Sequence, residues 1–147
     1  SLVEVWQSVD RVSLVRQVSA HTTSARMLVQ VNVSGEPSKG GCPPDEAPAL
    51  VAEARDRGLE VAGLMAVGRA GASEGARPGF RLLRELADQL GLAERSMGMS
   101  RDLEVAVQEG STMVRVGEAL FGPRPSRISR TRAGAGVGSN LGELRRT

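Results

Sequence analysis

The feature of this sequence that most constrains its fold is a regular alternation between two hydrophobic periods. Segments 26–33 (RMLVQVNV) and 59–67 (LEVAGLMAV) are short, apolar at their centres and rich in strand-forming residues. Segment 78–90 instead repeats its apolar residues at intervals of three and four, as an amphipathic helix does. Strands that alternate with helices predict an α/β fold in which crossover helices join parallel strands.

The alternation accounts for about five strands and four full helices in residues 1–122. The strands are expected at 3–8, 26–33, 59–67, 95–99 and 112–116. The helices are expected after an N-cap at Asp10, from Pro44, over 78–90, after a cap at Ser100 or a neighbour and, as one short turn, between Gly117 and Gly122. A closed eight-stranded β/α barrel needs about 250 residues. By length alone, an open and doubly wound sheet is therefore favoured.

The charge of the chain is unevenly distributed. Residues 123–147 contain six arginines and one glutamate, a net charge of +5, whereas the whole chain carries +2. This tail is rich in Gly and Ser and poor in apolar residues, so we expect it to be disordered. The remaining residues carry a net charge of −3 and contain no basic or aromatic cluster. They give no support for nucleic-acid binding as the main function.

The composition also bears on the compartment. No segment approaches the roughly 18 uninterrupted apolar residues of a membrane-spanning helix, and the first ten residues resemble no secretion signal. The single cysteine, Cys42, can form no internal disulfide, which agrees with a reducing compartment. We expect a cytoplasmic protein with no membrane contact, in which Cys42 is a spare thiol in a loop.

Two strand ends carry the residue types of a phosphate site. Ser96, Met97 and Gly98 lie at the end of the fourth expected strand, and Gly117 and Glu118 follow the fifth. Ligands of parallel α/β folds bind at the carboxyl ends of the strands. A phosphate is favoured where a glycine-containing turn meets a helix N-terminus, because unpaired N–H groups point outwards there. The two neighbouring strand ends could therefore hold one phosphate between them.

Three segments together resemble a known family: NVSGEPSKGG (32–41), GLMAV (63–67) and SMGMSRDLEVAVQEGSTMVRVGEALFG (96–122). In order and spacing they resemble the pyridoxal phosphate homeostasis family, the YggS/PROSC proteins, whose fold is similar to the N-terminal barrel of alanine racemase. The likeness runs from about Val5 to Gly122 and includes the opening WQSVDRVSL (6–14). It implies that residues 1–122 are the C-terminal part, about five β/α units, of a TIM-type (β/α)8 barrel that lacks its first strands.

The resemblance implies that the chain binds pyridoxal 5′-phosphate. It places the cofactor's phosphate at the two strand ends, on Ser96, Met97, Gly98, Gly117 and Glu118. Many relatives have a hydroxyl residue where this chain has Glu118. Because a carboxylate repels phosphate, we expect the backbone N–H of Glu118 to make the contact, and not its side chain.

Arg115 matches the arginine that faces the pyridine nitrogen in alanine-racemase-like proteins. Since an arginine accepts no proton, the ring nitrogen opposite it would stay neutral, and the ring would be a weak electron sink. The family's Schiff-base lysine lies on the first barrel strand in a V-S-K-type segment, and nothing in this chain resembles that segment. The one lysine of the chain, Lys39, aligns with the S-K-x-G loop of the family instead.

The resemblance therefore implies a non-catalytic carrier that serves pyridoxal-phosphate-dependent apo-enzymes. Because the strand with the Schiff-base lysine is missing, we expect cofactor binding without a covalent bond and a carrier function that is impaired. Two alternatives remain open. A racemase-like enzyme would need a lysine and a second acid/base such as tyrosine, and the chain contains no tyrosine. An interaction module would have its incomplete barrel completed by a second copy or another chain, pairing at the exposed strand edge of 3–8.

Overall fold

The computed structural model describes residues 3–22 and 26–122. The predicted disorder of the tail concerns residues 123–147, which lie outside this range. The elements occur in the order β1 (Val5–Val9), α1 (Val12–His21), β2 (Arg26–Gln30), α2 (Ala47–Asp56), β3 (Glu60–Met65), η1 (Ser73–Ala76), α3 (Arg77–Gln89), β4 (Glu94–Ser96), α4 (Leu103–Gln108) and α5 (Glu118–Phe121).

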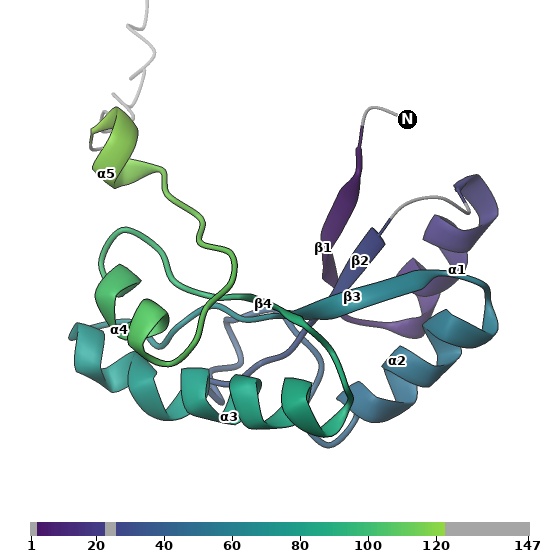
Figure 1. Ribbon diagram of the computed structural model, residues 1–147, viewed down its shortest axis with the longest axis horizontal. Coiled ribbons are helices and arrows are strands. Elements are labelled where there is room, and N and C mark those ends of the chain that lie inside the picture. The colour runs from purple at the N-terminus through teal and green to yellow at the C-terminus, as the bar shows by residue number, and fades with distance from the viewer. Residues whose placement is uncertain (1–2, 23–25, 123–147) are drawn as a thin grey trace, which may run out of the picture.

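The four strands form one parallel sheet in the order β1-β2-β3-β4, as the alternation of periods predicts. Residues of β2 and β3 such as Val29 and Leu64 pack with those of α2 and α3, such as Val51 and Phe80, in a single core. Helices α2 and α3 run along one side of the sheet (Figure 1). A sequential strand order with one helix-covered face differs from a doubly wound sheet, whose helices cover both faces.

The opposite face of the sheet is concave. Ser96 of β4 donates a hydrogen bond of 2.8 Å to the side-chain carbonyl of Gln7 in β1, although β2 and β3 lie between these strands. In a flat sheet, three strand spacings would separate the two backbones by about 14 Å, which is more than the two side chains can bridge. The sheet therefore curves strongly towards this face.

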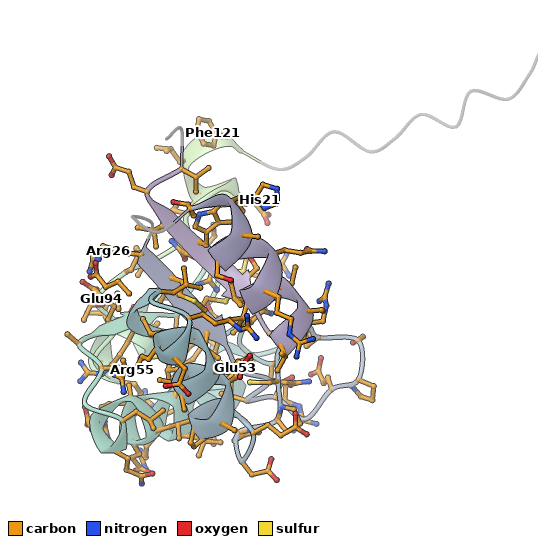
Figure 2. The ribbon with its side chains drawn as sticks, turned by 90° about the vertical axis from the view of Figure 1, so that its right-hand side faces the viewer. His21, Arg26, Glu53, Arg55, Glu94 and Phe121 are labelled. Atoms are coloured by element: carbon orange, nitrogen blue, oxygen red, sulfur yellow. The ribbon has the colours of Figure 1, made fainter. Side chains whose placement is uncertain are left out.

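The two ends of the strands differ in character. At the amino ends, Arg26 forms ion pairs with Glu60 (3.0 Å) and with Glu94 (3.6 Å), which clamp β2, β3 and β4 together. Figure 2 shows Arg26 and Glu94 beside each other at the left, with Phe121 apart from them at the top of the view. The loops that follow the carboxyl ends of the strands are long and polar, and they form the candidate site.

The prediction of a fifth strand at 112–116 is wrong. This segment makes only an isolated parallel bridge, between Met113 and Ser96. The ladder fails after this bridge because the N–H of Arg115 donates to the carbonyl of Gly98, at 3.0 Å, and not to that of Met97, so the register shifts by one residue. The strands predicted at 26–33 and 95–99 are likewise shorter, ending at Gln30 and Ser96.

Three predicted helix starts also need correction. Helix α2 begins at Ala47 and not at Pro44, since 44–46 form a turn. Asp10 is not the N-cap of α1: the cap is Arg11, and the Asp10 carboxylate pairs with the Arg11 guanidinium at 2.7 Å. The cap of α4, predicted at Ser100 or a neighbour, is Asp102. The hydroxyl of Ser100 instead accepts a hydrogen bond of 3.0 Å from the N–H of Ala119, at the start of α5.

Candidate functional site

A cleft of about 700 Å³ opens at the carboxyl ends of β3 and β4. Its walls are the loop after β3, the segment 99–102 after β4, and α5. Three basic residues from different loops line it: Lys39, Arg69 and Arg101. Its size and its place at the strand ends are those of a small-molecule site in a parallel α/β fold.

The loop 32–41 presents Lys39 to this cleft. The side-chain amide of Asn32 donates to the carbonyls of Glu36 (3.0 Å) and Lys39 (3.1 Å), while its oxygen accepts from the Ser34 hydroxyl (3.0 Å) and the Gly35 N–H (3.1 Å). One side chain thus satisfies four groups of an otherwise irregular loop. These hydrogen bonds inside the loop fix its conformation. Lys39, the one lysine of the chain, therefore has a defined place at the cleft.

Arg115 and Ser96 are in direct contact. The Arg115 guanidinium donates from Nη1 to the carbonyl and the hydroxyl of Ser96, at 2.9 and 2.7 Å, and from Nη2 to the carbonyl of Ala66 at 2.7 Å. Burial lowers the pKa of Arg115, and the nearby Asp102 carboxylate opposes this shift. Arginine remains a cation at any physiological pH, so the site holds a fixed, half-buried positive charge.

Gly98 and Met97 play different parts. Gly98 has φ +96°, and a Cβ at this position would lie 2.5 Å from the Cβ of Ala106. Its carbonyl accepts from the Arg115 N–H at 3.0 Å. The Met97 side chain is fully buried in the core under the helices, and its N–H donates to Met113. Of these two predicted residues, only Gly98 has a backbone N–H with no acceptor among the described residues, and Gly98 is itself buried.

Gly117 and Glu118 line the cleft, opposite Ser100 and Arg101. The Glu118 carboxylate lies 3.9 Å from the Arg101 guanidinium and points away from the protein interior, since half of its side chain is exposed. The structure thus places the six predicted residues in two groups. Ser96, Gly98 and Arg115 are in contact beside the concave face, Gly117 and Glu118 line the cleft, and Met97 belongs to neither.

Sequence reasoning missed three contributors. Ser100 holds the start of α5, and it could have been suspected because it lies within the SMGMS run. The carbonyl of Ala66 gives no signal in a sequence. Gln7 contacts Ser96 from 89 positions away in the chain, so no local pattern points to it.

Other reactive groups do not add to the site. Burial raises the pKa of the Cys42 thiol to about 11, so at neutral pH it is a protonated, buried thiol and a poor nucleophile. Within residues 3–22 and 26–122, no group of three His, Cys, Asp or Glu side chains is placed to hold a metal ion. In the same ranges no helix has the length and apolar character needed to cross a membrane.

Residues 1–125 match the family model for the N-terminal domain of alanine racemase. The chain belongs to this family. It is 44% identical over 125 residues to the pyridoxal phosphate homeostasis protein of Pseudomonas aeruginosa, in a match that covers 80% of this chain and 54% of that protein. The chain spans about half the length of the curated relatives that it matches. The resemblance to the pyridoxal phosphate homeostasis proteins is thereby confirmed.

Solved structures agree with this assignment. A protein from Bifidobacterium adolescentis superposes with a TM-score of 0.75 at 36% identity, over 81% of this chain and 53% of that one. PipY from Synechococcus elongatus, solved with pyridoxal phosphate bound, gives a TM-score of 0.67 at 27% identity, over 81% of this chain and 61% of its own. The parallel four-stranded sheet is thus a partial match to barrels of the alanine racemase N-terminal type.

Proposed function

We propose that this chain binds pyridoxal 5′-phosphate without a covalent bond, as part of a protein that stores and delivers the cofactor. The observation that carries the proposal is the fixed position of the Arg115 guanidinium. It is half-buried, fixed by three hydrogen bonds beside Ser96, and still has N–H groups left to donate. A guanidinium of this kind suits the pyridine nitrogen of the cofactor.

The strand ends also suit the cofactor's phosphate. No acceptor in residues 3–22 and 26–122 pairs with the backbone N–H groups of Gly98, Gly117 and Glu118. Unpaired N–H groups in the loops at the carboxyl end of a parallel sheet are typical phosphate ligands. We assign the phosphate to the N–H groups of Gly117 and Glu118, which line the cleft. Met97, whose N–H is already used, and the Glu118 carboxylate, which would repel a phosphate, make no direct contact with it.

We further infer that residues 1–122 form one unit, the part of a (β/α)8 barrel that holds about its last five β/α units. Three features support this inference: the sequential parallel strand order, the single helix-covered face and the curvature shown by the contact between Gln7 and Ser96. The segment 112–116 then stands in the place of the last barrel strand, although it keeps only one bridge to β4.

No catalytic reaction is proposed for this chain. The bound cofactor would offer an aldehyde that reacts with primary amines, and Lys39 is the only lysine that could meet it. Lys39 lines the same cleft as Gly117 and Glu118. It lies on the S-K-x-G loop, however, and does not match the Schiff-base lysine of the family. A racemase would need a second acid/base near the ring, and the chain contains no tyrosine. Delivery of the cofactor to pyridoxal-phosphate-dependent apo-enzymes fits this site better than turnover does.

The test is a titration of the purified chain with pyridoxal 5′-phosphate, followed by absorbance, with inorganic phosphate as the competitor. We expect saturable binding that Arg115→Ala weakens about tenfold or more, the effect of one lost charge-assisted contact. Arg55→Ala, which alters an exposed arginine of α2, is the control and should bind as the unaltered chain does.

Borohydride reduction and peptide mapping complete the test. We expect no adduct on Lys39. A stoichiometric adduct on Lys39 would make the chain a covalent binder and contradict the proposed mode of binding. Equal affinity in the Arg115→Ala and Arg55→Ala variants would remove Arg115 from the site.

A further inference from the structure

We propose that Gln7 is a positioning residue for Arg115 and acts through the hydroxyl of Ser96. The inference about the guanidinium rests on the geometry of this chain alone. Only its consequence for the cofactor depends on the proposed function. Gln7 lies on β1, at one end of the sheet, and Arg115 follows β4, at the other.

The side chains of Arg115, Ser96 and Gln7 form a continuous chain of hydrogen bonds. Arg115 Nη1 lies 2.7 Å from Ser96 Oγ, and Ser96 Oγ lies 2.8 Å from Gln7 Oε1. Ser96 is fully buried and Gln7 partly so. In such surroundings each hydrogen bond polarises the next one, so the strength of one contact depends on its neighbour.

The direction of these bonds follows from the chemistry of the groups. A guanidinium can only donate, so Ser96 Oγ accepts from Arg115 and its own proton must go to another acceptor. The Gln7 carbonyl is that acceptor. The Gln7 amide nitrogen faces the sulfur of Met113 at 2.9 Å, a weak acceptor that suits N–H and not C=O. The Ser96 hydroxyl thus donates its proton to the Gln7 carbonyl.

The hydrogen bond to Gln7 changes the role of Ser96. A hydroxyl whose proton is held by Gln7 does not donate to a phosphate, and its lone pair instead holds the guanidinium. Without the Gln7 carbonyl, the Ser96 hydroxyl would have to donate to another acceptor. It would then rotate out of its hydrogen bond with Arg115 Nη1. Arg115 would then lose one of its three hydrogen bonds and much of its fixed orientation.

The first experiment needs no cofactor. In a chain labelled with nitrogen-15 on arginine, NMR measures how fast the Arg115 guanidinium rotates, and an Arg115→Lys variant identifies its signal. We expect rotation about tenfold faster in Gln7→Leu, from the loss of one charge-assisted hydrogen bond. Gln7→Glu, which keeps an acceptor for Ser96, should rotate as slowly as the unaltered chain. Gln17→Leu, on the exposed surface of α1, is the matched control.

Ser96→Ala removes the hydroxyl that lies between Gln7 and Arg115. It is the second variant to measure if Gln7→Leu does not fold. Combining Ser96→Ala with Gln7→Leu should add nothing to either change alone, because both act through one hydroxyl. Unchanged rotation in a folded Gln7→Leu variant would overturn the proposal, whatever Ser96→Ala does. So would an equal acceleration in Gln17→Leu.

The second experiment measures the consequence for binding. Gln7→Leu should weaken pyridoxal 5′-phosphate several-fold and leave the affinity for its deaza analogue, which lacks the ring nitrogen, unchanged. A general structural defect would weaken both ligands equally and would overturn the positioning role. If the unaltered chain binds neither ligand while the NMR result holds, the proposed function fails and the positioning of Arg115 by Gln7 stands.

Discussion

At the scale of single residues, the site depends on backbone that no other residue type would permit. Gly98 adopts φ +96° between Ser96, which holds Arg115, and Ser100, which holds α5. A side chain at position 98 would meet Ala106 of α4 and would strain the backbone at the same time. This one residue therefore lets the chain turn closely over α4 on its way from the concave face to the cleft.

We expect Gly98→Ala to lower the free energy of unfolding by about 2–4 kcal/mol, from the left-handed backbone and the contact with Ala106 together. Gly91→Ala is the control: its φ is +64°, and no atom lies within 4 Å of the added Cβ. It should cost only about 1 kcal/mol, from the backbone alone. Urea denaturation of both variants measures the difference, and equal costs would show that the contact with Ala106 is relieved by a small shift.

The hydroxyl of Ser100 fixes the start of α5 beside the cleft. Its loss in Ser100→Ala removes the acceptor of the Ala119 N–H and should cost about 1 kcal/mol locally. Amide hydrogen exchange at Ala119 should therefore become several-fold faster, while exchange in α3 stays unchanged. Ser13→Ala, on the exposed face of α1, should leave Ala119 as it is. Unaltered exchange in Ser100→Ala would mean that α5 is held by other contacts.

At the scale of elements, one carboxylate joins α4 to α3. Glu109 is buried and forms ion pairs with three arginines of α3: Arg77 (3.0 Å), Arg81 (3.2 Å) and Arg84 (3.2 Å). Hydrogen bonds from Arg81 and Arg77 lower the pKa of Glu109, so its charged form is the one that the fold stabilises. This contact ends α4 next to the segment that leads to Arg115, and so it supports the site indirectly.

Glu109→Gln should lower the urea midpoint at pH 7 clearly more than Glu85→Gln, which changes an exposed glutamate of α3. The difference between the two variants should depend on pH. Because the folded pKa of Glu109 is depressed, its contribution is complete above the unfolded pKa of about 4.3. It is lost as the pH falls through the lower folded value. A difference that persisted at pH 2 would argue against the charge as its cause.

At the scale of the whole molecule, the curved sheet leaves one edge open. Among the described residues, β1 pairs only with β2, and an apolar groove between its outer edge and α1 is lined by Trp6, Val9, Leu14 and Val18. Exposed strand edges pair with other chains unless they are blocked. The chain should therefore associate with itself at high concentration.

Sedimentation velocity over a range of concentrations measures this association. Trp6→Lys should raise the apparent dissociation constant about tenfold or more, because it places a charge at the centre of the contact. Val12→Lys is a matched control, since Val12 and Trp6 are both 39% exposed, and it should leave the association unchanged. The fluorescence of Trp6, the one tryptophan of the chain, should shift to shorter wavelength as the unaltered chain associates. A chain that stays monomeric at all concentrations would contradict an open edge at β1.

The sequence by itself determined the class of fold, the places of α1, α2 and α3, and the family. These follow from local periods and from motifs such as 96–122, in which each residue's neighbours lie nearby in the chain. The family resemblance of 96–122 also pointed to Arg115 and Gly98, which match positions of the family's cofactor site.

Only the tertiary structure decided how the sheet curves and which face each residue joins. It buried the Met97 side chain in the core, reduced 112–116 to a single bridge, and brought Gln7 to Ser96 across two intervening strands. These outcomes depend on the register and curvature of strands that are distant in the chain. Such features are set by the packing of the whole sheet against its helices, and no local pattern encodes them.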